Sequence, residues 1–520
     1  MAALRSFFSR KSVLLTVWMF ASVAPWLFYI CRTGQVFIDI VLFKGFSSSL
    51  FALMIASAIS ATVLAFLRIR SSRLKDARLL PSPFLGWSVA SFVLTFVFTV
   101  VWIASLATMG KESSPVALRM LLPTLPIGAA VIAAVFFALF FPALSSPKLR
   151  TAIAVVTIAA LLFGTIGTLY PLSKFRFLAD PMVLDTGKGY SIVFATNTSG
   201  TGFVRYDYGG KTYTLYDTDN GRKENALIHS VFVPYEHLDG NAYTVGATRV
   251  IDELSYGGTN GKTIVSDIYR FSERNRNDQT TYLSVSDWHT FNDLALRTAS
   301  LRTEYDGILL LGDALPGLQF EEEAAEYIVK FGGDLSGGTI PVVYVRGNHE
   351  TRGAYATELS GALGLEKFYY TVETDACRFV VLDSAEDKND DHPEYGGMTD
   401  YTAHRTQMVE WLEGLTPSEK PTVILSHAPE ICIENDLRAR AFAAIESLNA
   451  TLMVSGHYHV AEMRKENDLD ILLDGGHSGK SFVASALTLT RTGIGIEAWN
   501  DKGTTVLTHT IDYRTPAADC

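Results

Sequence analysis

Side chains that bind metals follow short apolar runs at five places in the second half of this 520-residue chain. The clearest is Pro341-Val-Val-Tyr-Val-Arg-Gly-Asn-His-Glu350, where β-branched residues suited to a buried strand give way, at Gly347, to an amide and an imidazole. The other four runs end in Asp287-Trp-His289, Gly312-Asp313, Ser426-His427 and Gly456-His-Tyr-His459. Nitrogen and oxygen ligands without a thiolate suit Fe, Mn or Zn. The pattern therefore indicates a metal site.

The elements that must position these groups are strands of an α/β fold. Each run is short, apolar and bounded by a turn residue, which is typical of central strands covered on both faces. Helical segments are predicted between them, at about Glu321 to Phe331 and His404 to Leu415. In such sheets ligands gather outside the carboxyl ends of the strands. Eight side chains should therefore converge on one rim: Asp287, His289, Asp313, Asn348, His349, His427, His457 and His459.

Composition divides the chain into an apolar first third and a mixed globular remainder, which predicts a membrane part and a soluble part. The formal net charge of −10 argues against a nucleic-acid-binding protein. Four cysteines are too few for a disulfide scaffold and lack the CxxC spacing of a zinc site. The spacing leaves a disulfide between Cys377 and Cys432 open without supporting it.

Residues 1–171 are predicted to form a membrane region with five transmembrane helices. Each apolar run is near the roughly 20 residues that a bilayer core requires. The runs are Ser12 to Cys31, Phe46 to Leu67, Phe84 to Thr108, Met120 to Leu144 and Thr151 to Tyr170. Ten basic residues flank one side of these spans and four flank the other, which places the N-terminus in the cytoplasm and everything after Tyr170 outside it. Because no ionisable residue lies deep in a span, anchoring is the expected role.

Residues 180–272 change to short alternating runs separated by Gly, Asn and Asp, as in a small β-sandwich. The predicted strands include Tyr190 to Thr196, Gly202 to Tyr208, Leu227 to Val233, Ala242 to Gly246 and Ile264 to Phe271. This succession resembles the fibronectin type III-like domain that precedes the catalytic domain in purple acid phosphatases. A polar link, Ser272 to Gln279, then leads into the segment 280–514.

The metal-binding motifs of residues 280–514 resemble those of the calcineurin-like metallophosphoesterase superfamily. Five motifs match in order: Asp287-x-His289, Gly312-Asp313, Gly347-Asn348-His349-Glu350, His427 in Ser-His-Ala-Pro, and Gly456-His457-x-His459. The resemblance implies two metals. The first would be held by Asp287, His289, Asp313 and His459, and the second by Asp313, Asn348, His427 and His457. Asp313 would bridge the two, and a hydroxide shared by the metals would attack phosphorus.

The resemblance also assigns His349 a catalytic role without metal ligation. As imidazolium it would stabilise phosphoryl oxygens or protonate the leaving group. One departure concerns purple acid phosphatases, which carry a tyrosine three residues after the bridging aspartate and no histidine in the first motif. This chain has Pro316 and His289 there, so no coloured tyrosinate-iron centre is expected.

Several neighbouring residues have two interpretations. Asn292 and Arg352 are candidates for contact with substrate phosphate, although exposure on a loop is the commoner outcome. Trp288 lies between ligands as a filler or a pocket residue, and His404 is expected to face solvent. The turn around His477 ends in Gly-Lys-Ser but precedes a predicted strand, so it is expected to border the metal rim rather than bind nucleotide.

The sequence thus predicts a membrane-anchored phosphoesterase with two Fe, Mn or Zn ions and an extracytoplasmic catalytic domain. Its substrates would be phosphomonoesters or phosphodiesters, and its partners the phosphoester and the lipid bilayer. Two alternatives remain open. The membrane helices could form part of a site for lipid-linked phosphates, or the protein could be a non-catalytic receptor on a phosphoesterase scaffold.

Overall fold

The computed structural model describes residues 174–254, 257–273, 279–302 and 304–513. The five predicted transmembrane helices fall in residues 1–171 and so lie outside the described residues. Within the described ranges, no helix combines the length and apolar character needed to cross a membrane. The described residues from Phe175 onward form one compact unit.

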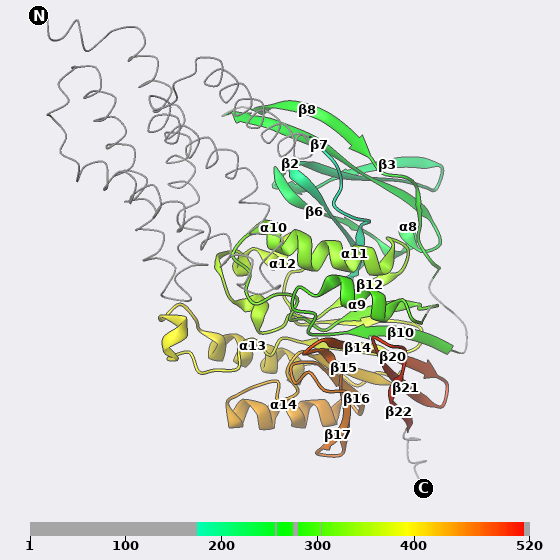
Figure 1. Cartoon of the computed structure of the whole chain (residues 1–520), viewed down its shortest axis with the longest axis vertical. Helices are drawn as coiled ribbons and strands as arrows, with labels where there is room; N and C mark the ends of the chain where they lie inside the picture. The colour runs from blue at the N-terminus through cyan, green and yellow to red at the C-terminus, as the bar shows by residue number, and fades with distance from the viewer. Residues whose placement is uncertain (1–173, 255–256, 274–278, 303, 514–520) are drawn as a thin grey trace, which may run out of the picture. The chain divides into compact units, whose positions relative to one another are not determined.

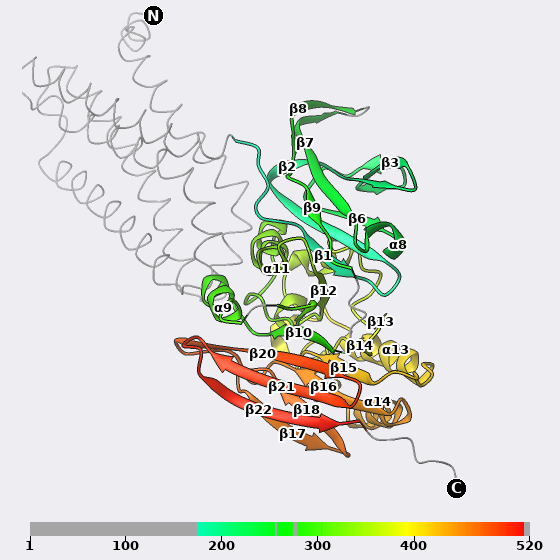
Figure 2. The same ribbon diagram turned by 90° about the vertical axis from the view of Figure 1, so that its right-hand side faces the viewer.

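The first of two large sheets has a parallel centre (Figure 1). Its four central strands are β10 (Gln279–Val285), β11 (Gly307–Leu310), β12 (Pro341–Tyr344) and β1 (Met182–Asp185). Beside β10 run β20 (Ser481–Thr490), β21 (Gly493–Asn500) and β22 (Thr505–Asp512), which are antiparallel to their neighbours (Figure 2). Beyond β1 follow β2 (Tyr190–Tyr208), β7 (Ala242–Leu254) and β8 (Gly257–Val265).

The second sheet is parallel at its centre and carries an antiparallel strand at each edge. Its order is β13 (Tyr370–Glu373), β14 (Arg378–Leu382), β15 (Thr422–Ser426), β16 (Ala450–Ser455), β18 (Leu469–Leu473) and β17 (Glu462–Glu466). Alternate residues along β14 face two different cores, as the period of two requires. Phe379 and Val381 pack against Leu309 and Val343 of the first sheet, whereas Val380 faces the helices.

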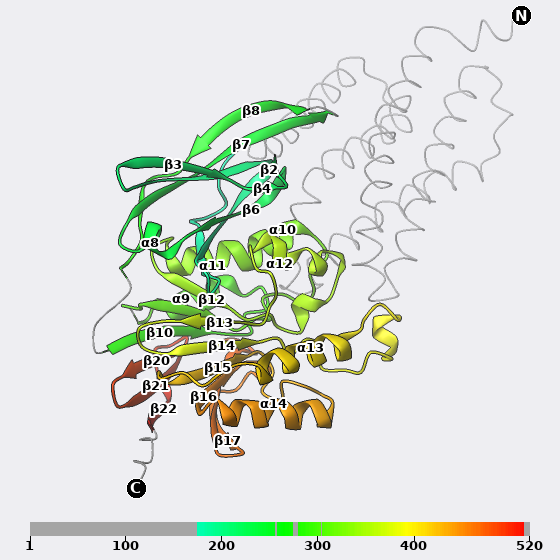
Figure 3. The same cartoon turned by 180° about the vertical axis from the view of Figure 1, so that it is seen from behind.

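Helices cover the outer faces of both sheets. On the second sheet lie α13 (Tyr401–Glu413) and α14 (Asn435–Ser447), which run alongside the strands in Figure 3. On the first sheet lie α9 (Asn292–Ala299), α10 (Glu321–Ala324) and α11 (Lys330–Ser336), the last two joined by a π-helical turn, Ala325–Val329. The predicted α/β core with strands covered on both faces is therefore confirmed, as are both predicted helices. The helix predicted from His404 begins earlier, because the Asp400 side chain accepts a hydrogen bond from the Ala403 N–H and caps it.

The β-rich segment continues the first sheet, since β1 pairs in parallel with β12. The two strands predicted at Tyr190 to Thr196 and Gly202 to Tyr208 form the single strand β2, which pairs with β6 over its first part and with β7 over its second. A Cβ atom at Gly202 would lie 2.3 Å from the ring of His229, so this glycine makes room for the ring and does not break the strand. The division into 180–272 and 280–514, with its fibronectin type III-like assignment, stays a prediction.

Shorter elements complete the described residues. The strands are β3 (Lys211–Tyr216), β4 (Thr218–Asp219), β5 (Arg222–Lys223), β6 (Ala226–Val233), β9 (Tyr269–Arg270) and β19 (Gly476–Ser478), and the helices are α8 (Tyr235–Leu238) and α12 (Leu359–Ala362). Short 3₁₀ turns occur at His349–Thr351, Ala354–Thr357 and Pro393–Tyr395.

Cys377 and Cys432 are free and buried, so the disulfide left open by the sequence does not form. Cys377 lies in the core between the two sheets. Cys432 lies in the core on the other face of the second sheet, under α13 and α14. A sheet thus separates the two thiols.

Candidate metal centre

All eight side chains predicted for the rim follow the carboxyl ends of five strands. Asp287 and His289 follow β10, Asp313 follows β11, Asn348 and His349 follow β12, His427 follows β15, and His457 and His459 follow β16. Three groups of these residues have ligand atoms within 4.8 Å of one another: Asp287, His289 and His459; His289, Asp313 and His349; and Asp313, His427 and His457. Asn348 Oδ1 lies 3.2 Å from His457 Nδ1. The structure therefore brings the whole predicted set together.

Asp313 occupies the middle of the cluster. Its Oδ2 atom lies 3.2 Å from His427 Nε2 and 3.8 Å from His289 Nε2, residues that belong to different groups. On the far side, Asp287 Oδ1 lies 3.6 Å from His459 Nε2. The carboxylate of Asp313 thus belongs to two of the three candidate metal-binding groups.

The cluster is buried on one side and open on the other. The side chains of Asp287 and His427 have no exposed surface, whereas those of His349 and His459 are 25% and 35% exposed. Metal ions bound here would be sheltered on the side of Asp287 and His427 and accessible from the side of His349 and His459.

The ligand loops have unusual backbone conformations. Asp287, His289, Asp313, His457 and His459 all have positive φ angles, between 38° and 71°. Such conformations cost of order 1 kcal/mol or more for residues with a Cβ, and they gather at functional sites. Five of the predicted ligands share this feature, so the fold supports local strain in order to aim their side chains.

Gly347 is required by the close approach of two loops. A Cβ atom there would lie 2.3 Å from both the backbone nitrogen and Oδ1 of Asp313. Its φ is not positive, so the turn that the sequence suggested is not the reason for this glycine. Any side chain would push the β12 loop away from Asp313.

Glu350 fastens the same two loops and was not singled out from the sequence as a site residue. Its buried carboxylate accepts hydrogen bonds from the backbone N–H groups of Asp313 (3.0 Å), Ala314 (2.5 Å) and Gly347 (2.9 Å). Burial and the neighbouring Asp313 carboxylate raise the pKa of Glu350 to about 7, although these hydrogen bonds oppose the rise. The sequence signal that could have identified Glu350 as a site residue was its place at the end of the Gly-Asn-His-Glu motif.

Backbone carbonyls orient three of the histidines. The Nδ1 atom of His427 lies 2.7 Å from the carbonyl oxygen of Leu311. The Nδ1 atom of His459 lies 2.6 Å from that of His477, and the Nδ1 atom of His349 lies 3.0 Å from that of Pro316. A carbonyl only accepts, so each Nδ1 carries a hydrogen and each Nε2 faces the carboxylates. This is the tautomer in which imidazole binds a metal through Nε2.

The charges of the cluster fit cations. Burial alone would lower the pKa of His427, but Asp313 outweighs burial and raises it to about 10. Burial lowers the pKa of His289 to about 3, so this imidazole stays neutral and offers a lone pair. A cation beside His427 must displace a proton, which makes metal binding weaken as the pH falls.

The amide of Asn348 also fits a metal ligand. With its oxygen toward the cluster, it adds an acceptor beside His457 Nδ1 and beside His427 Nε2, which becomes an acceptor once a cation displaces its proton. Turned over, its nitrogen would donate to these histidines, and its oxygen would accept from Arg352 Nη2 at 2.9 Å. The first orientation would offer the amide oxygen to a cation, whereas the second satisfies the hydrogen bonds of the neighbouring side chains.

The neighbouring residues divide into packing residues and rim residues. Trp288 is buried, stacks on Phe331 and donates from Nε1 to the Tyr327 carbonyl. Asn292 donates to the Glu326 carbonyl, away from the cluster. The turn at His477 borders the rim as predicted, because its backbone bonds both Asp287 and His459.

His404 was expected to face solvent, but its Nε2 lies 2.9 Å from the buried carboxylate of Asp383. Asp383 also accepts two hydrogen bonds from Arg346, at 3.2 and 2.6 Å. The helix α13 brings His404 over the end of β14, an arrangement that local sequence does not reveal. Arg346 and His404, whose side chains are 10% and 30% exposed, thus form a network with the buried carboxylate of Asp383.

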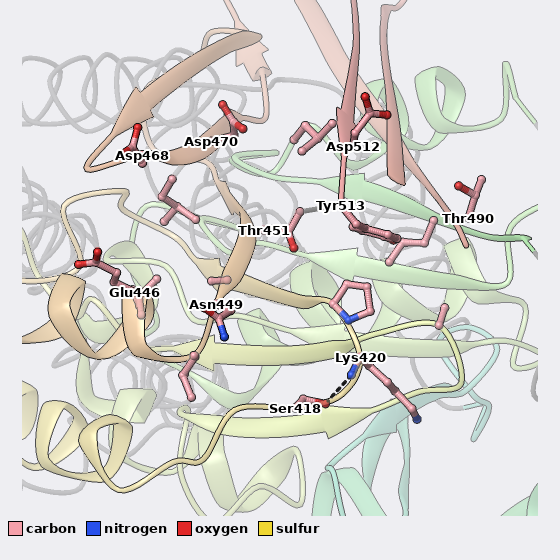
Figure 4. A pocket seen from close by; sticks show the side chains of 18 of the residues that line it. Ser418, Lys420, Glu446, Asn449, Thr451, Asp468, Asp470, Thr490, Asp512 and Tyr513 are labelled. Atoms are coloured by element: carbon pink, nitrogen blue, oxygen red, sulfur yellow. Dashed lines mark hydrogen bonds between the residues drawn. The ribbon is translucent and has the colours of Figure 1, made fainter. Parts of the chain in front are cut away.

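A cavity of about 1140 Å³ lies at the opposite end of the strands (Figure 4). Its lining includes Pro421, Ala450 and Leu469, at or next to the starts of β15, β16 and β18. The predicted ligands His427, His457 and His459 follow the other ends of β15 and β16, and no predicted ligand lines this cavity.

The sequence profile of the calcineurin-like phosphoesterase family matches residues 280–461. Residues 280–461 form a calcineurin-like phosphoesterase domain. No curated protein matches the chain. Among solved structures, GAP50 of Plasmodium, described as the anchor in the inner membrane complex, is 14% identical, with 46% of this chain and 90% of that chain covered and a TM-score of 0.35.

Two further structures are similar to parts of the chain. The phosphopantetheinyl hydrolase PptH of Mycobacterium tuberculosis is 17% identical, with 38% of this chain and 89% of that chain covered and a TM-score of 0.26. Wild-type Vps29 of Entamoeba histolytica, complexed with zinc, is 11% identical, with 45% and 100% covered and a TM-score of 0.23. The phosphoesterase domain and its cluster of metal-binding side chains make the protein a metal-dependent phosphoester hydrolase.

Replacing Glu350 in the phosphoesterase domain is expected to weaken metal binding. In Glu350→Gln, an amide N–H would face backbone N–H groups, so the Asp313 and Asn348 loops would separate. We expect metal affinity to fall by about 10- to 100-fold, measured by titration calorimetry with Mn²⁺. Glu366→Gln, at an exposed position, is the matched control and should bind as the wild type does. Equal affinity in both variants would contradict the role given to Glu350.

The network at Asp383 should make stability depend on pH. Burial raises the pKa of Asp383, but Arg346 and His404 outweigh burial and hold it below the usual range. The interactions of ionised Asp383 with Arg346 and His404 therefore stabilise the fold above pH about 4, where an unfolded aspartate is ionised. This contribution is lost as the pH falls toward the pKa of Asp383 in the folded protein. At pH 7, Asp383→Asn should cost about 3 to 5 kcal/mol.

Urea unfolding at pH 7, 5 and 3 checks this prediction. The difference in the free energy of unfolding between wild type and Asp383→Asn should shrink at pH 3. Asp219→Asn, at an exposed position, should change stability little at any of these pH values. A constant difference across the series would contradict the pH dependence.

Proposed function

We propose that the protein is a membrane-anchored phosphoesterase that uses two metal ions to hydrolyse phosphomonoesters or phosphodiesters outside the cytoplasm. The observation that carries the proposal is the position of Asp313, whose carboxylate contacts ligands of both halves of the cluster. The eight rim residues come from five strand-end loops, and every one of them has a side chain suited to ligation or proton transfer.

The first metal would bind Asp287, His289, Asp313 and His459, and the second Asp313, Asn348, His427 and His457. The oxygen and nitrogen donors suit Mn, Fe or Zn. Two such ions, when bound, supply Lewis acidity and lower the pKa of water.

The rest of the chemistry belongs to side chains of the chain. Asp313 and Asp287 place negative charge between and beside the cations. The Pro316 carbonyl holds His349 Nδ1, and His349 Nε2 lies 3.8 Å from Asp313 Oδ2. His349 thus faces the open side of the cluster, where it can donate a proton to a phosphoryl oxygen or to the leaving-group oxygen.

Membrane attachment is supported by the five apolar runs in residues 1–171 and by the bias of basic residues toward one side. On this proposal residues 180–272 and 280–514 follow the anchor outside the cytoplasm, and the spans act as an anchor.

Replacing the central carboxylate tests the enzymatic part. Asp313→Asn should lower kcat on an aryl phosphate by at least about 100-fold with Mn²⁺ or Fe²⁺, because the shared ligand loses its charge. Asp334→Asn alters a surface pair with Lys330 and should keep full turnover. Removal of metal by a chelator should abolish wild-type turnover, and added Mn²⁺ should restore it. Undiminished turnover of Asp313→Asn would remove the mechanism.

Fractionation of expressing cells tests the anchor. The full chain is expected to stay with the membranes after an alkaline carbonate wash, because five apolar spans strongly favour the bilayer. Protease added outside intact cells should digest the segment after Tyr170. Permeabilised cells serve as the control for protease access. Release into the wash, or protection that is lost only on permeabilisation, would contradict the predicted topology.

A further inference from the structure

Arg352 lies against the metal rim rather than in open solvent. Its Nη1 atom is 3.2 Å from His349 Nδ1, whose hydrogen is directed at the Pro316 carbonyl, so the two groups are neighbours that do not share a hydrogen bond. Its Nη2 atom lies 2.9 Å from the outer end of the Asn348 amide, where the amide oxygen accepts a hydrogen bond from Nη2 in the turned-over orientation and the amide nitrogen lies in the other. The guanidinium therefore contacts both the proposed proton donor and a proposed ligand of the second metal.

Glu386 holds the guanidinium in a fixed orientation. Both carboxylate oxygens of Glu386 are used, one by Nε and the other by Nη2 at 3.0 Å. The Glu386 side chain is fully buried, the Thr351 hydroxyl donates to it at 3.3 Å, and Arg405 donates to its backbone carbonyl at 3.1 Å. A planar guanidinium that is bound along one edge has little rotational freedom, so its remaining N–H donors are held in fixed directions.

The hydrogens of Nη1 are the donors that Glu386 does not use. Nη1 lies beside His349, on the open side of the cluster, and the Arg352 side chain is 31% exposed. Arg346 precedes the same loop and is bound to Asp383 in the same way, at 3.2 and 2.6 Å, but its side chain is only 10% exposed. Arg352 is thus the arginine of this loop that faces an arriving phosphoryl group.

We propose that Arg352 binds a non-bridging phosphoryl oxygen through Nη1 and makes the enzyme prefer phosphomonoesters over phosphodiesters. This inference rests on the proposed function. A monoester dianion carries one more negative charge and one more terminal oxygen than a diester. Donors of a charged guanidinium bind such an oxygen more strongly than neutral donors do. Glu386 neutralises the net charge of the pair, but it also directs the free N–H groups toward the rim.

Two substrates with the same leaving group test the proposal on the full-length, metal-loaded protein in detergent. These are p-nitrophenyl phosphate and bis(p-nitrophenyl) phosphate, compared by kcat/KM. Arg352→Ala should lower kcat/KM for the monoester by at least about tenfold, the effect of losing one hydrogen bond to a charged group. Its effect on the diester should stay below about threefold. Competitive inhibition by inorganic phosphate should weaken by about the same factor as the monoester reaction.

Arg352→Lys keeps the charge but loses the fork, because one ammonium cannot hold Glu386 and also reach the phosphoryl oxygen. We expect it to lose monoester preference in the same direction, by about threefold or more. The matched control is Arg440→Ala. Arg440 forms a similar two-bond pair with Glu413, at 2.8 and 2.7 Å, but it lies on the outer surface between α14 and α13. This variant should leave both substrates and phosphate inhibition unchanged.

The outcomes separate this inference from the function on which it rests. Equal losses on both esters in the two Arg352 variants, or loss of bound metal in Arg352→Ala, would make Arg352 a support for Asn348 and His349 and overturn the proposal. If Arg352→Ala does not fold, an unchanged ratio of the two esters in Arg352→Lys overturns it equally. A wild-type protein that binds two metals and hydrolyses neither ester would remove the proposed function itself.

Discussion

The metal centre depends on two backbone loops that pass within van der Waals distance of each other. The loop after β11 carries Asp313 and the loop after β12 carries Asn348, and only a residue without a Cβ, Gly347, fits where they meet. Glu350 then joins the loops through three N–H groups. Parallel pairing of β11 with β12 sets the approach, because neighbouring parallel strands end at the same edge. The position of the central carboxylate is thus a consequence of strand register.

Burial of like charges is the cost that this arrangement carries. Asp287 and Asp313 lie in the same buried cluster, and burial together with Asp313 raises the pKa of Asp287 although two imidazoles oppose it. Such a group of carboxylates is unfavourable unless protons or cations accompany it. The strained φ angles at five of the ligands add to the cost. Metal binding would offset both the burial of the carboxylates and the backbone strain, so affinity for cations and stability of the loops are coupled.

The sequence predicted the features that depend on local pattern. Strand ends followed by Asp, Asn and His were visible one by one, and parallel topology made them converge. Pairings between distant segments were not visible, and β1 joining β12 across more than 150 residues is the main example. The gap predicted between Thr196 and Gly202 is instead part of the single strand β2. His404 looked exposed because its partner, Asp383, belongs to another element.

The same distinction explains why Arg352 and Glu350 differ in how easily they are found. Glu350 lies within four residues of Gly347, so a motif contains it, and its partners are backbone groups that any sequence would supply. Arg352 acquires its role from Glu386, whose carboxylate reaches it from the loop after β14 in the second sheet. The ligands of the metal rim therefore come from both sheets. The guanidinium of Arg352 is held in place by a contact between a first-sheet loop and a second-sheet loop. Glu350 fastens the Asp313 and Asn348 loops to each other without using Glu386, so the second-sheet loop that carries Glu386 acts on the rim mainly through Arg352 and Thr351.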